Sequence, residues 1–205
     1  MINAQIQTTL THLYNDSKRD KLKLTKGLAM NLCRQLQPLD LKDVYLSITR
    51  EQGIYLKQLI IDNNLKNLVE FGTSFGISTL FLAEAALKTK GKIITTELIQ
   101  SKAEKAIENF KKAGVNNLIE VKIGNALETL NNYNEPIDFL LLDGWKDLYL
   151  PLFLLLKPNF HDKTVIYVDN ADMVEVQDFL KTIGSLKKYQ LRTIHNEKAA
   201  IITLV

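Results

Sequence analysis

LVEFGTSFGIST is the sequence of residues 68–79, and this stretch indicates how the chain folds. Its apolar start predicts a short β-strand at Leu68–Phe71, and its end predicts a helix at Ile77–Leu87. Between them, Gly72 and Gly76 allow a tight turn and a close approach of the backbone to a ligand. The stretch lacks the G-K-S or G-K-T sequence of a phosphate-binding P-loop, which excludes that motif. A glycine-rich turn without a ligand is the alternative that this segment alone leaves open.

The same order of strand and helix repeats through the rest of the chain. Further strands are predicted at 92–96, 118–123, 137–142 and 164–168. Helices are predicted at 101–113, near 127, at 148–156 and at 174–183. Two last strands, at 189–194 and 199–204, predict a hairpin. The pattern predicts an α/β fold with a doubly wound, mostly parallel seven-stranded sheet and an antiparallel C-terminal hairpin.

Residues 1–65 have a different pattern, which predicts an N-terminal helical extension. Apolar residues recur at helical spacing at positions 6, 10 and 13, and again at 28, 32 and 36. A further helix begins after Thr49, a plausible N-cap with Gln52 three residues later, and its predicted buried side includes Ile54, Leu56 and Ile60. We therefore divide the chain into a helical cap region, 1–65, and a main domain, 66–205.

The composition is that of a soluble globular protein. With 205 residues, of which 46% are hydrophobic and 24% charged, the chain fits one domain with an extension. No apolar window is long enough to span a membrane, the N-terminus lacks a signal-peptide core, and the single cysteine forms no internal disulfide. We expect a cytoplasmic protein. The net charge of +3 falls short of a concentrated nucleic-acid-binding surface, and we expect Lys102, Lys105, Lys111 and Lys112 on the exposed face of a helix.

Two predicted strands end in acidic residues. Asp143 follows the strand at 137–142, and Asp169 and Asn170 follow the strand at 164–168. Open α/β sheets bind ligands at the carboxyl ends of their strands, and neighbouring strands lie about 4.8 Å apart. The two acids could therefore share one ion, and oxygen ligands favour Mg²⁺ or a similar cation over zinc. The alternative is a pair of strand-end acids that cap helices or pair with lysines.

Two further segments favour an adenosine-type ligand. Glu97 ends the second strand, where an acid can accept both hydroxyls of a ribose. A solvated glutamate is the simpler interpretation. Gly124, Asn125 and Ala126 follow the third strand and could pass beside an adenine ring, although an ordinary turn fits them equally well.

Taken together, these motifs resemble those of the class I S-adenosylmethionine-dependent methyltransferases, and among them the metal-dependent O-methyltransferases. The resemblance runs from about residue 50 to the C-terminus. Val69–Thr79 is similar to motif I of the family, and Asp143–Pro151 is similar to the corresponding stretch of the catechol O-methyltransferases. Asp169 and Asn170 match the metal-binding pair. The relatives have a histidine at the position of Gly144, so a different local shape is expected there.

The resemblance implies a Rossmann-like methyltransferase fold, with 66–205 as the S-adenosylmethionine-binding catalytic domain. It also implies a role for each matching residue. The methionine end of the cofactor would contact Glu70, Gly72, Ser74 and Ser78. The ribose would contact Glu97, and the adenine Asn125, Ala126 and Trp145. Mg²⁺ would be held by Asp143, Asp169 and Asn170, with Asp143 also beside the cofactor. Lys146 would be the general base, and Glu197 is a candidate by position for an acid that grips a second acceptor hydroxyl.

The implied activity is Mg²⁺-dependent methylation of a hydroxyl on a small, catechol-like acceptor. The sequence leaves two alternatives open. One is the methylation of a hydroxylated uridine in tRNA, which no basic patch interleaved with aromatic residues supports. The other is a non-catalytic S-adenosylmethionine-binding protein, against which the complete set of Asp143, Lys146, Asp169 and Asn170 argues. We expect a homodimer with no membrane partner.

Overall fold

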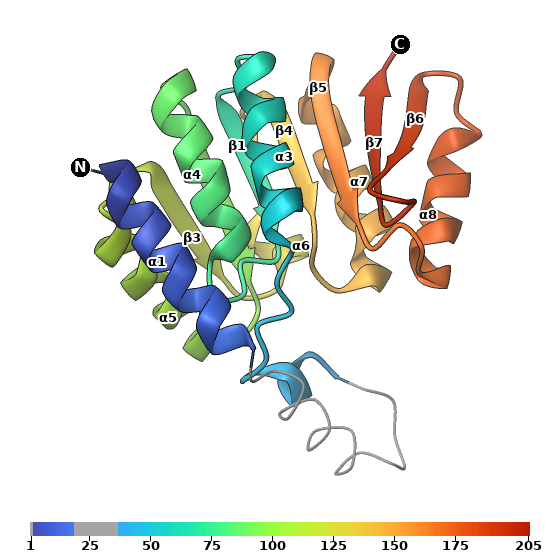
Figure 1. The fold of residues 1–205 in the computed structure, drawn as a ribbon. Helices are drawn as coiled ribbons and strands as arrows, with labels where there is room; N and C mark the ends of the chain where they lie inside the picture. The colour runs from blue at the N-terminus through green and yellow to red at the C-terminus, as the bar shows by residue number, and fades with distance from the viewer. Residues whose placement is uncertain (1, 19–36) are drawn as a thin grey trace.

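The computed structural model describes residues 2–18 and 37–205 (Figure 1). Seven strands form one sheet in the order β3-β2-β1-β4-β5-β7-β6. The strands are β1 (Asn67–Phe71), β2 (Lys92–Glu97), β3 (Ile119–Ile123), β4 (Ile137–Leu142), β5 (Phe160–Asp169), β6 (Tyr189–Ile194) and β7 (Ala199–Leu204). The first five are parallel, whereas β7 runs antiparallel to both β5 and β6. The predicted seven-stranded sheet with its antiparallel hairpin is confirmed.

Helices cover both faces of the sheet. They are α1 (Ile2–Ser17), α3 (Arg50–Asp62), α4 (Ile77–Thr89), α5 (Gln100–Ala113), α6 (Ala126–Thr129), α7 (Tyr149–Leu156) and α8 (Val174–Gly184). Short 3₁₀ turns lie at Pro38–Leu41, Asn116–Leu118, Lys146–Leu148 and Lys157–Asn159. None of the helices in the described ranges is long and apolar enough to cross a membrane.

Two hydrophobic cores result from the alternation of side chains along the strands. In β4, Phe139 and Leu141 pack with α1, α3, α4 and α5, whereas Leu140 and Leu142 pack with α6, α7 and α8. A strand directs successive side chains to opposite faces, so a strand that is apolar throughout must be covered on both sides. The unbroken apolar sequence of β4 is therefore explained by its central position.

The N-terminal region contributes α1 and α3 to the first core. In Figure 1, α1 lies across α4 and α5, and α3 lies beside α4. Ile6, Leu10 and Leu13 of α1 are buried there, as their spacing predicts. The helical pattern at 28, 32 and 36 lies outside the described residues. The boundary at residue 65 stays a prediction.

The start of α3 confirms one local prediction and corrects another. The Thr49 hydroxyl accepts the backbone N–H of Gln52 (3.1 Å), and the Gln52 side chain accepts the backbone N–H of Thr49 (2.9 Å). This is the predicted capping box. Leu56 and Ile60 are buried, but Ile54 is 49% exposed, because α3 turns only one narrow face toward α4.

Candidate active site

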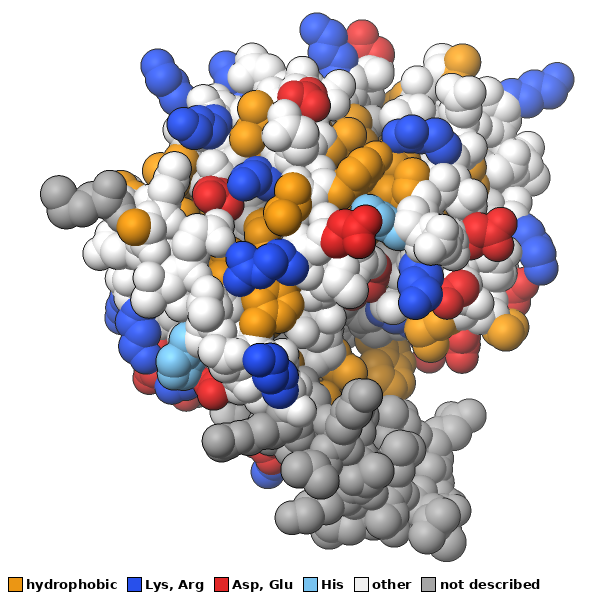
Figure 2. Space-filling model, in the orientation of Figure 1, with side chains coloured by type: hydrophobic (Ala, Val, Ile, Leu, Met, Phe, Trp, Pro, Cys, Tyr) orange, Lys and Arg blue, Asp and Glu red, His pale blue; other side chains and the backbone are white. Residues whose placement is uncertain are grey.

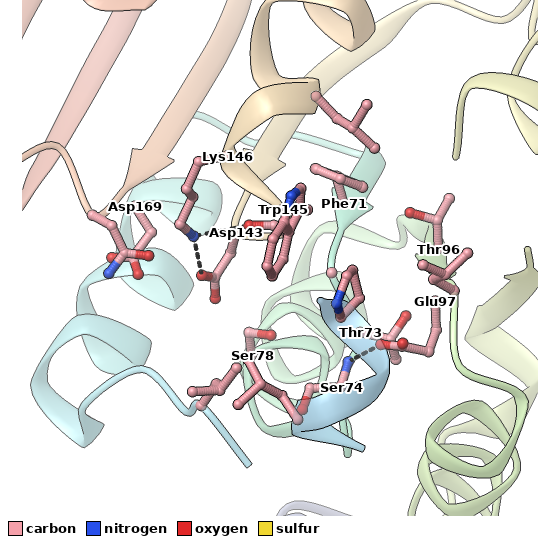
Figure 3. A pocket seen from close by; sticks show the side chains of 18 of the residues that line it. Phe71, Thr73, Ser74, Ser78, Thr96, Glu97, Asp143, Trp145, Lys146 and Asp169 are labelled. Carbon is pink, nitrogen blue, oxygen red and sulfur yellow. Dashed lines mark hydrogen bonds and ion pairs between the residues drawn. The ribbon is translucent and has the colours of Figure 1, made fainter. Parts of the chain in front are cut away.

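A cavity of about 1210 Å³ opens at the carboxyl ends of the central strands. It lies where the strand order reverses between β1 and β4, which is the usual ligand site of open α/β sheets. Every residue that the sequence assigned to the site lines this cavity except Glu70 and Glu197. Figure 3 shows Lys146, Asp143 and Asp169 on one side of it and Glu97 with Ser74 on the other.

The turn between β1 and α4 requires glycine at position 72. Gly72 has a φ of 107°, and a side chain there would place its Cβ 2.6 Å from the carbonyl oxygen of Asp143. The backbone N–H groups of Gly72 and Thr73 both donate to the carbonyl of Thr96 (3.2 and 3.0 Å). The glycine therefore lets the loop lie directly against the end of β4, next to the predicted acceptor residues.

Glu70 is fully buried beneath this loop and does not line the cavity. One of its carboxyl oxygens accepts the hydroxyls of Thr79 (2.5 Å) and Thr95 (2.6 Å). Its other oxygen, Oε1, has no hydrogen-bond partner among the described residues. Burial raises the pKa of Glu70 above its ordinary value. Glu70 supports the glycine-rich turn from below, with one oxygen still able to accept a hydrogen bond.

Glu97 stands at the end of β2 and faces the cavity. Its two carboxyl oxygens accept the backbone N–H groups of Ser74 (2.8 Å) and Ile99 (2.9 Å). Each oxygen has a second lone pair, so the group retains capacity for ligand hydroxyls. Burial raises the pKa of Glu97, and the Ile99 N–H and the charge of Lys102 partly oppose that shift.

Lys102 is not on the exposed face of its helix, so this prediction is wrong. Lys102 is only 4% exposed and lines the cavity, and its Nζ lies 5.4 Å from the centre of the Phe75 ring. The other three lysines, Lys105, Lys111 and Lys112, are exposed as predicted. Lys102 differs because the first turn of α5 begins directly after β2 and faces Glu97.

Asp143 and Asp169 meet at the rim of the sheet. Their strands β4 and β5 are neighbours, and Leu142 pairs with Val168, so the next residue of each strand comes to the same edge. The two carboxyl groups line the same cavity, and each influences the pKa of the other. Burial and the charge of Asp169 raise the pKa of Asp143, and burial raises that of Asp169. Two carboxylates with little exposure at one strand edge are stabilised by a proton or a cation between them.

Lys146 supplies a positive charge to this pair. Its Nζ lies 3.9 Å from Oδ1 of Asp143 and donates to the carbonyl of Gly144 (2.9 Å) and to the hydroxyl of Tyr149 (3.0 Å). The 3₁₀ turn Lys146–Leu148 bends the chain so that the amine faces the cavity. The side chain is thus fixed by short-range contacts and still faces the cavity.

The end of β5 places Asn170 beside the acids. Asn170 has a φ of 57°, a backbone conformation that asparagine adopts more readily than most residues, and it lines the cavity. The described residues contain no cluster of three or more His, Cys, Asp or Glu side chains arranged for a metal. Any cation at this site would therefore have two carboxylates and an amide from the predicted set.

The structure explains why residue 144 is a glycine. A Cβ there would lie 2.5 Å from the ring of Phe71, which fills the space that a side chain at 144 would need. The following residue, Trp145, is half-buried and lines the cavity between the two groups of polar residues. Phe71 therefore leaves no room for a side chain at position 144, while the difference from the relatives stays a prediction.

Several assigned side chains are already engaged within the protein. The Ser74 hydroxyl donates to the carbonyl of Tyr45 (2.7 Å), and Oδ1 of Asn125 accepts the N–H of Leu127 (3.0 Å) as the N-cap of α6. Asn-Ala-Leu-Glu is a typical helix start, so this cap was readable from the sequence. Glu197 is exposed and does not line the cavity, whereas the next residue, Lys198, does.

Residues from before β1 complete the cavity, and sequence reasoning did not place them there. Tyr45 lines it and stacks on Phe75, with ring centroids 4.2 Å apart. Gln52 lines it as well and donates from Nε2 to Oδ1 of Asp169 (2.9 Å). Only the capping box marked Gln52 in the sequence, and a capping box gives no information on contacts with a strand more than a hundred residues away.

Comparison with known proteins identifies a consistent group of similar chains. The family model described as O-methyltransferase matches residues 25–183. A catechol O-methyltransferase of Niastella koreensis is 30% identical over 130 residues, covering 62% of this chain and 58% of the relative. Caffeoyl-CoA O-methyltransferase 2 of Petunia hybrida is 31% identical over 135 residues, covering 63% of this chain and 52% of the relative. The chain thus spans a little over half the length of these curated relatives.

A solved structure shows the same fold. The O-methyltransferase from Bacillus cereus in complex with SAH superimposes with a TM-score of 0.69, covering 89% of this chain and 90% of that chain at 24% identity. The arrangement of sheet and helices described above is therefore that of a methyltransferase of known structure.

Proposed function

Because this chain belongs to the O-methyltransferase family, we propose that it transfers a methyl group from S-adenosylmethionine to a hydroxyl of a small acceptor. The observation that carries this proposal is the single cavity, which joins Glu97 and the glycine-rich turn to the Asp143, Lys146 and Asp169 cluster. The first set suits a nucleoside ligand, and the second suits the deprotonation of a hydroxyl. Their shared cavity supports a reaction between two bound molecules.

In this proposal the cofactor is held by the ends of β1, β2 and β4. Glu97 is already oriented by two backbone N–H groups and would accept the ribose hydroxyls with its remaining lone pairs. The uncovered backbone at Gly72 would let the methionine end approach closely, beside Ser78. Trp145 would pack on the adenine. Glu70, buried beneath the turn, would act on the cofactor only through the turn that it supports.

The residues present also fit a divalent cation. Asp169 is buried, Asp143 is half-buried, and Asn170 adds a neutral oxygen to their carboxyl oxygens at the same rim. Such hard donors suit Mg²⁺. When bound, S-adenosylmethionine supplies an electrophilic methyl group, and a divalent cation lowers the pKa of a coordinated hydroxyl. A cation would also relieve the repulsion between the two carboxylates.

The chain's own residues would then handle the proton and the geometry. Lys146 Nζ, as an uncharged amine, would take the proton of the acceptor hydroxyl and become an ammonium group, since it faces the cavity beside Asp143. The hydrogen bonds from Nζ to Gly144 and Tyr149 would hold it in place for that transfer. Rigid placement of acceptor and methyl donor on the ends of neighbouring strands would supply much of the acceleration.

We propose an acceptor with two neighbouring hydroxyls on an aromatic ring. The two curated relatives are named after catechol and caffeoyl-CoA, and a caffeoyl group carries the same dihydroxyphenyl ring as a catechol. Leu46 and Met173 line the cavity and would contact the face of this ring.

A methyl-transfer screen tests the proposal. The purified protein would be incubated with S-adenosylmethionine and, separately, catechols, caffeoyl-CoA and bulk tRNA, with products identified by mass spectrometry. We expect a methyl group on one oxygen of a catechol-type ring. If uridine in tRNA is methylated and the catechols remain unmodified, the proposed catechol-type acceptor is contradicted. Binding of S-adenosylmethionine without any product would favour a non-catalytic binding protein.

A further inference from the structure

Gln52 links two parts of the site that are far apart in the sequence. It lies in the first turn of α3 and lines the cavity. Its Oε1 accepts the backbone N–H of Thr49 (2.9 Å), and its Nε2 donates to Oδ1 of Asp169 (2.9 Å). The two ends of one amide therefore join the start of α3 to the end of β5.

The neighbouring contacts hold this turn of α3 against β5. Tyr55 lies one turn after Gln52, and its ring contacts those of Tyr167 and His195, with centroids 6.4 and 5.0 Å apart. The Tyr55 hydroxyl accepts from Arg192 (3.3 Å). Tyr167 is two residues before Asp169, on the same face of β5, and is fully buried. The packing of Tyr55 thus holds the first turns of α3, and Gln52 with them, beside β5.

We propose that Gln52 is a positioning residue that fixes the Asp169 carboxylate for its role beside Asp143. A neutral amide is suited to this task, because it donates a hydrogen bond to a carboxylate without adding another charge to a crowded acidic pair. The donation occupies Oδ1, which fixes the carboxylate relative to Asp143. The inference rests on the proposed function for the importance of Asp169, but the contact itself is independent of any ligand.

A double-mutant cycle on the full chain tests this positioning. Gln52→Met would be measured by urea unfolding in the natural background and in an Asp169→Ala background. We expect Gln52→Met to lower the folding equilibrium constant by about tenfold more in the natural background than in the Asp169→Ala background. This is the factor typical of a hydrogen bond to a charged group. An equal loss in both backgrounds would overturn the inference.

Two further variants separate the positioning from helix capping. Thr49→Ala removes the hydroxyl of the same capping box without touching Asp169, so its effect should be independent of Asp169→Ala. Gln52→Glu keeps an oxygen for the Thr49 N–H but turns a carboxylate toward Asp169. It should lower stability in the presence of Asp169 and much less in the Asp169→Ala background. Coupling of Thr49→Ala as strong as that of Gln52→Met would assign the effect to the helix start and contradict the positioning.

A titration with Mn²⁺ connects the inference to the site. In calorimetry, Gln52→Met should weaken Mn²⁺ binding by about tenfold, while Thr49→Ala stays within about twofold of the natural protein. If the natural protein binds no Mn²⁺ but the cycle shows coupling, the proposed cation site fails and the positioning of Asp169 stands. If Mn²⁺ binds but the cycle shows no coupling, the positioning of Asp169 by Gln52 fails and the proposed cation site stands.

Discussion

The side-chain nitrogen of Lys146 lies 3.9 Å from Oδ1 of Asp143, on the side of the cavity opposite Glu97. Three positions along the chain separate the two residues, and the 3₁₀ turn at Lys146–Leu148 brings the amine back over the strand end. A basic group is thus held beside a carboxyl group that would hold a cation. This relationship is the geometric basis of the proposed proton transfer.

Replacing Lys146 should therefore affect turnover and leave cofactor binding intact. Lys146→Ala removes the proposed base, and we expect the methyl-transfer rate to fall by about a hundredfold to ten-thousandfold. Its affinity for S-adenosylhomocysteine, measured by calorimetry, should stay within about threefold of the natural value. Lys105→Ala, on the exposed face of α5, serves as the control and should change neither quantity. A fully active Lys146→Ala variant would remove this residue from the mechanism.

Cofactor affinity should depend on pH through Glu97. Its pKa is raised by burial, and only the ionised carboxylate accepts both ribose hydroxyls. As the pH falls through this raised pKa, Glu97 takes up a proton, and we expect the dissociation constant of S-adenosylhomocysteine to increase. The loss should begin at a higher pH than an ordinary glutamate would give. Glu97→Gln should bind at least about tenfold more weakly and show no such dependence, whereas a matching pH profile in this variant would exclude Glu97 as its source.

Glu70 should make the stability of the protein depend on pH in the opposite sense to a salt-bridged acid. Burial raises its pKa in the folded state above the ordinary value of 4.5, so the unfolded chain loses this proton first as the pH rises. The contribution of Glu70 to stability is complete below 4.5 and declines as the pH increases through the raised value. Urea unfolding of the natural protein and of Glu70→Gln over this range should diverge, with the variant gaining in relative stability. Parallel curves would contradict the raised pKa.

The glycine at position 72 should tolerate no side chain. Gly72→Ala combines a φ of 107° with a Cβ placed 2.6 Å from the Asp143 carbonyl, and we expect a loss of about 2–4 kcal/mol in unfolding free energy. Gly184→Ala is the matched control, because its nearest neighbouring atom would be 3.6 Å from the new Cβ. That substitution should be neutral or stabilising by up to about 1 kcal/mol. Similar losses at both positions would contradict the steric argument.

The sequence predicted the elements of the sheet well where local patterns determine them. The apolar run of β4 and the acid that follows it place Asp143 at the rim, and the neighbouring β5 does the same for Asp169. The start of β5 was predicted four residues too late, because His161, Asp162 and Lys163 are polar. Pairing with β4 extends β5 to Phe160, and the local sequence of these polar residues does not indicate a strand.

Contacts across the fold were the part that the sequence could not provide. Its charge suggested an exposed face for Lys102, but this lysine lies in the first turn of α5, close to the end of β2, and lines the cavity. The sequence predicts the capping role of Gln52 correctly, whereas its contact with Asp169 depends on how α3 lies against β5. Such roles follow from tertiary geometry, and only the structure reveals them.

The most direct test of the account is the dependence of methyl transfer on a divalent cation. The natural protein would be treated with EDTA, and transfer of labelled methyl groups from S-adenosylmethionine to the best catechol acceptor would be followed before and after adding Mg²⁺. We predict that EDTA abolishes transfer, that Mg²⁺ restores it, and that Asp169→Ala is not restored. Full methyl transfer in the presence of EDTA would contradict the proposed site at Asp143 and Asp169.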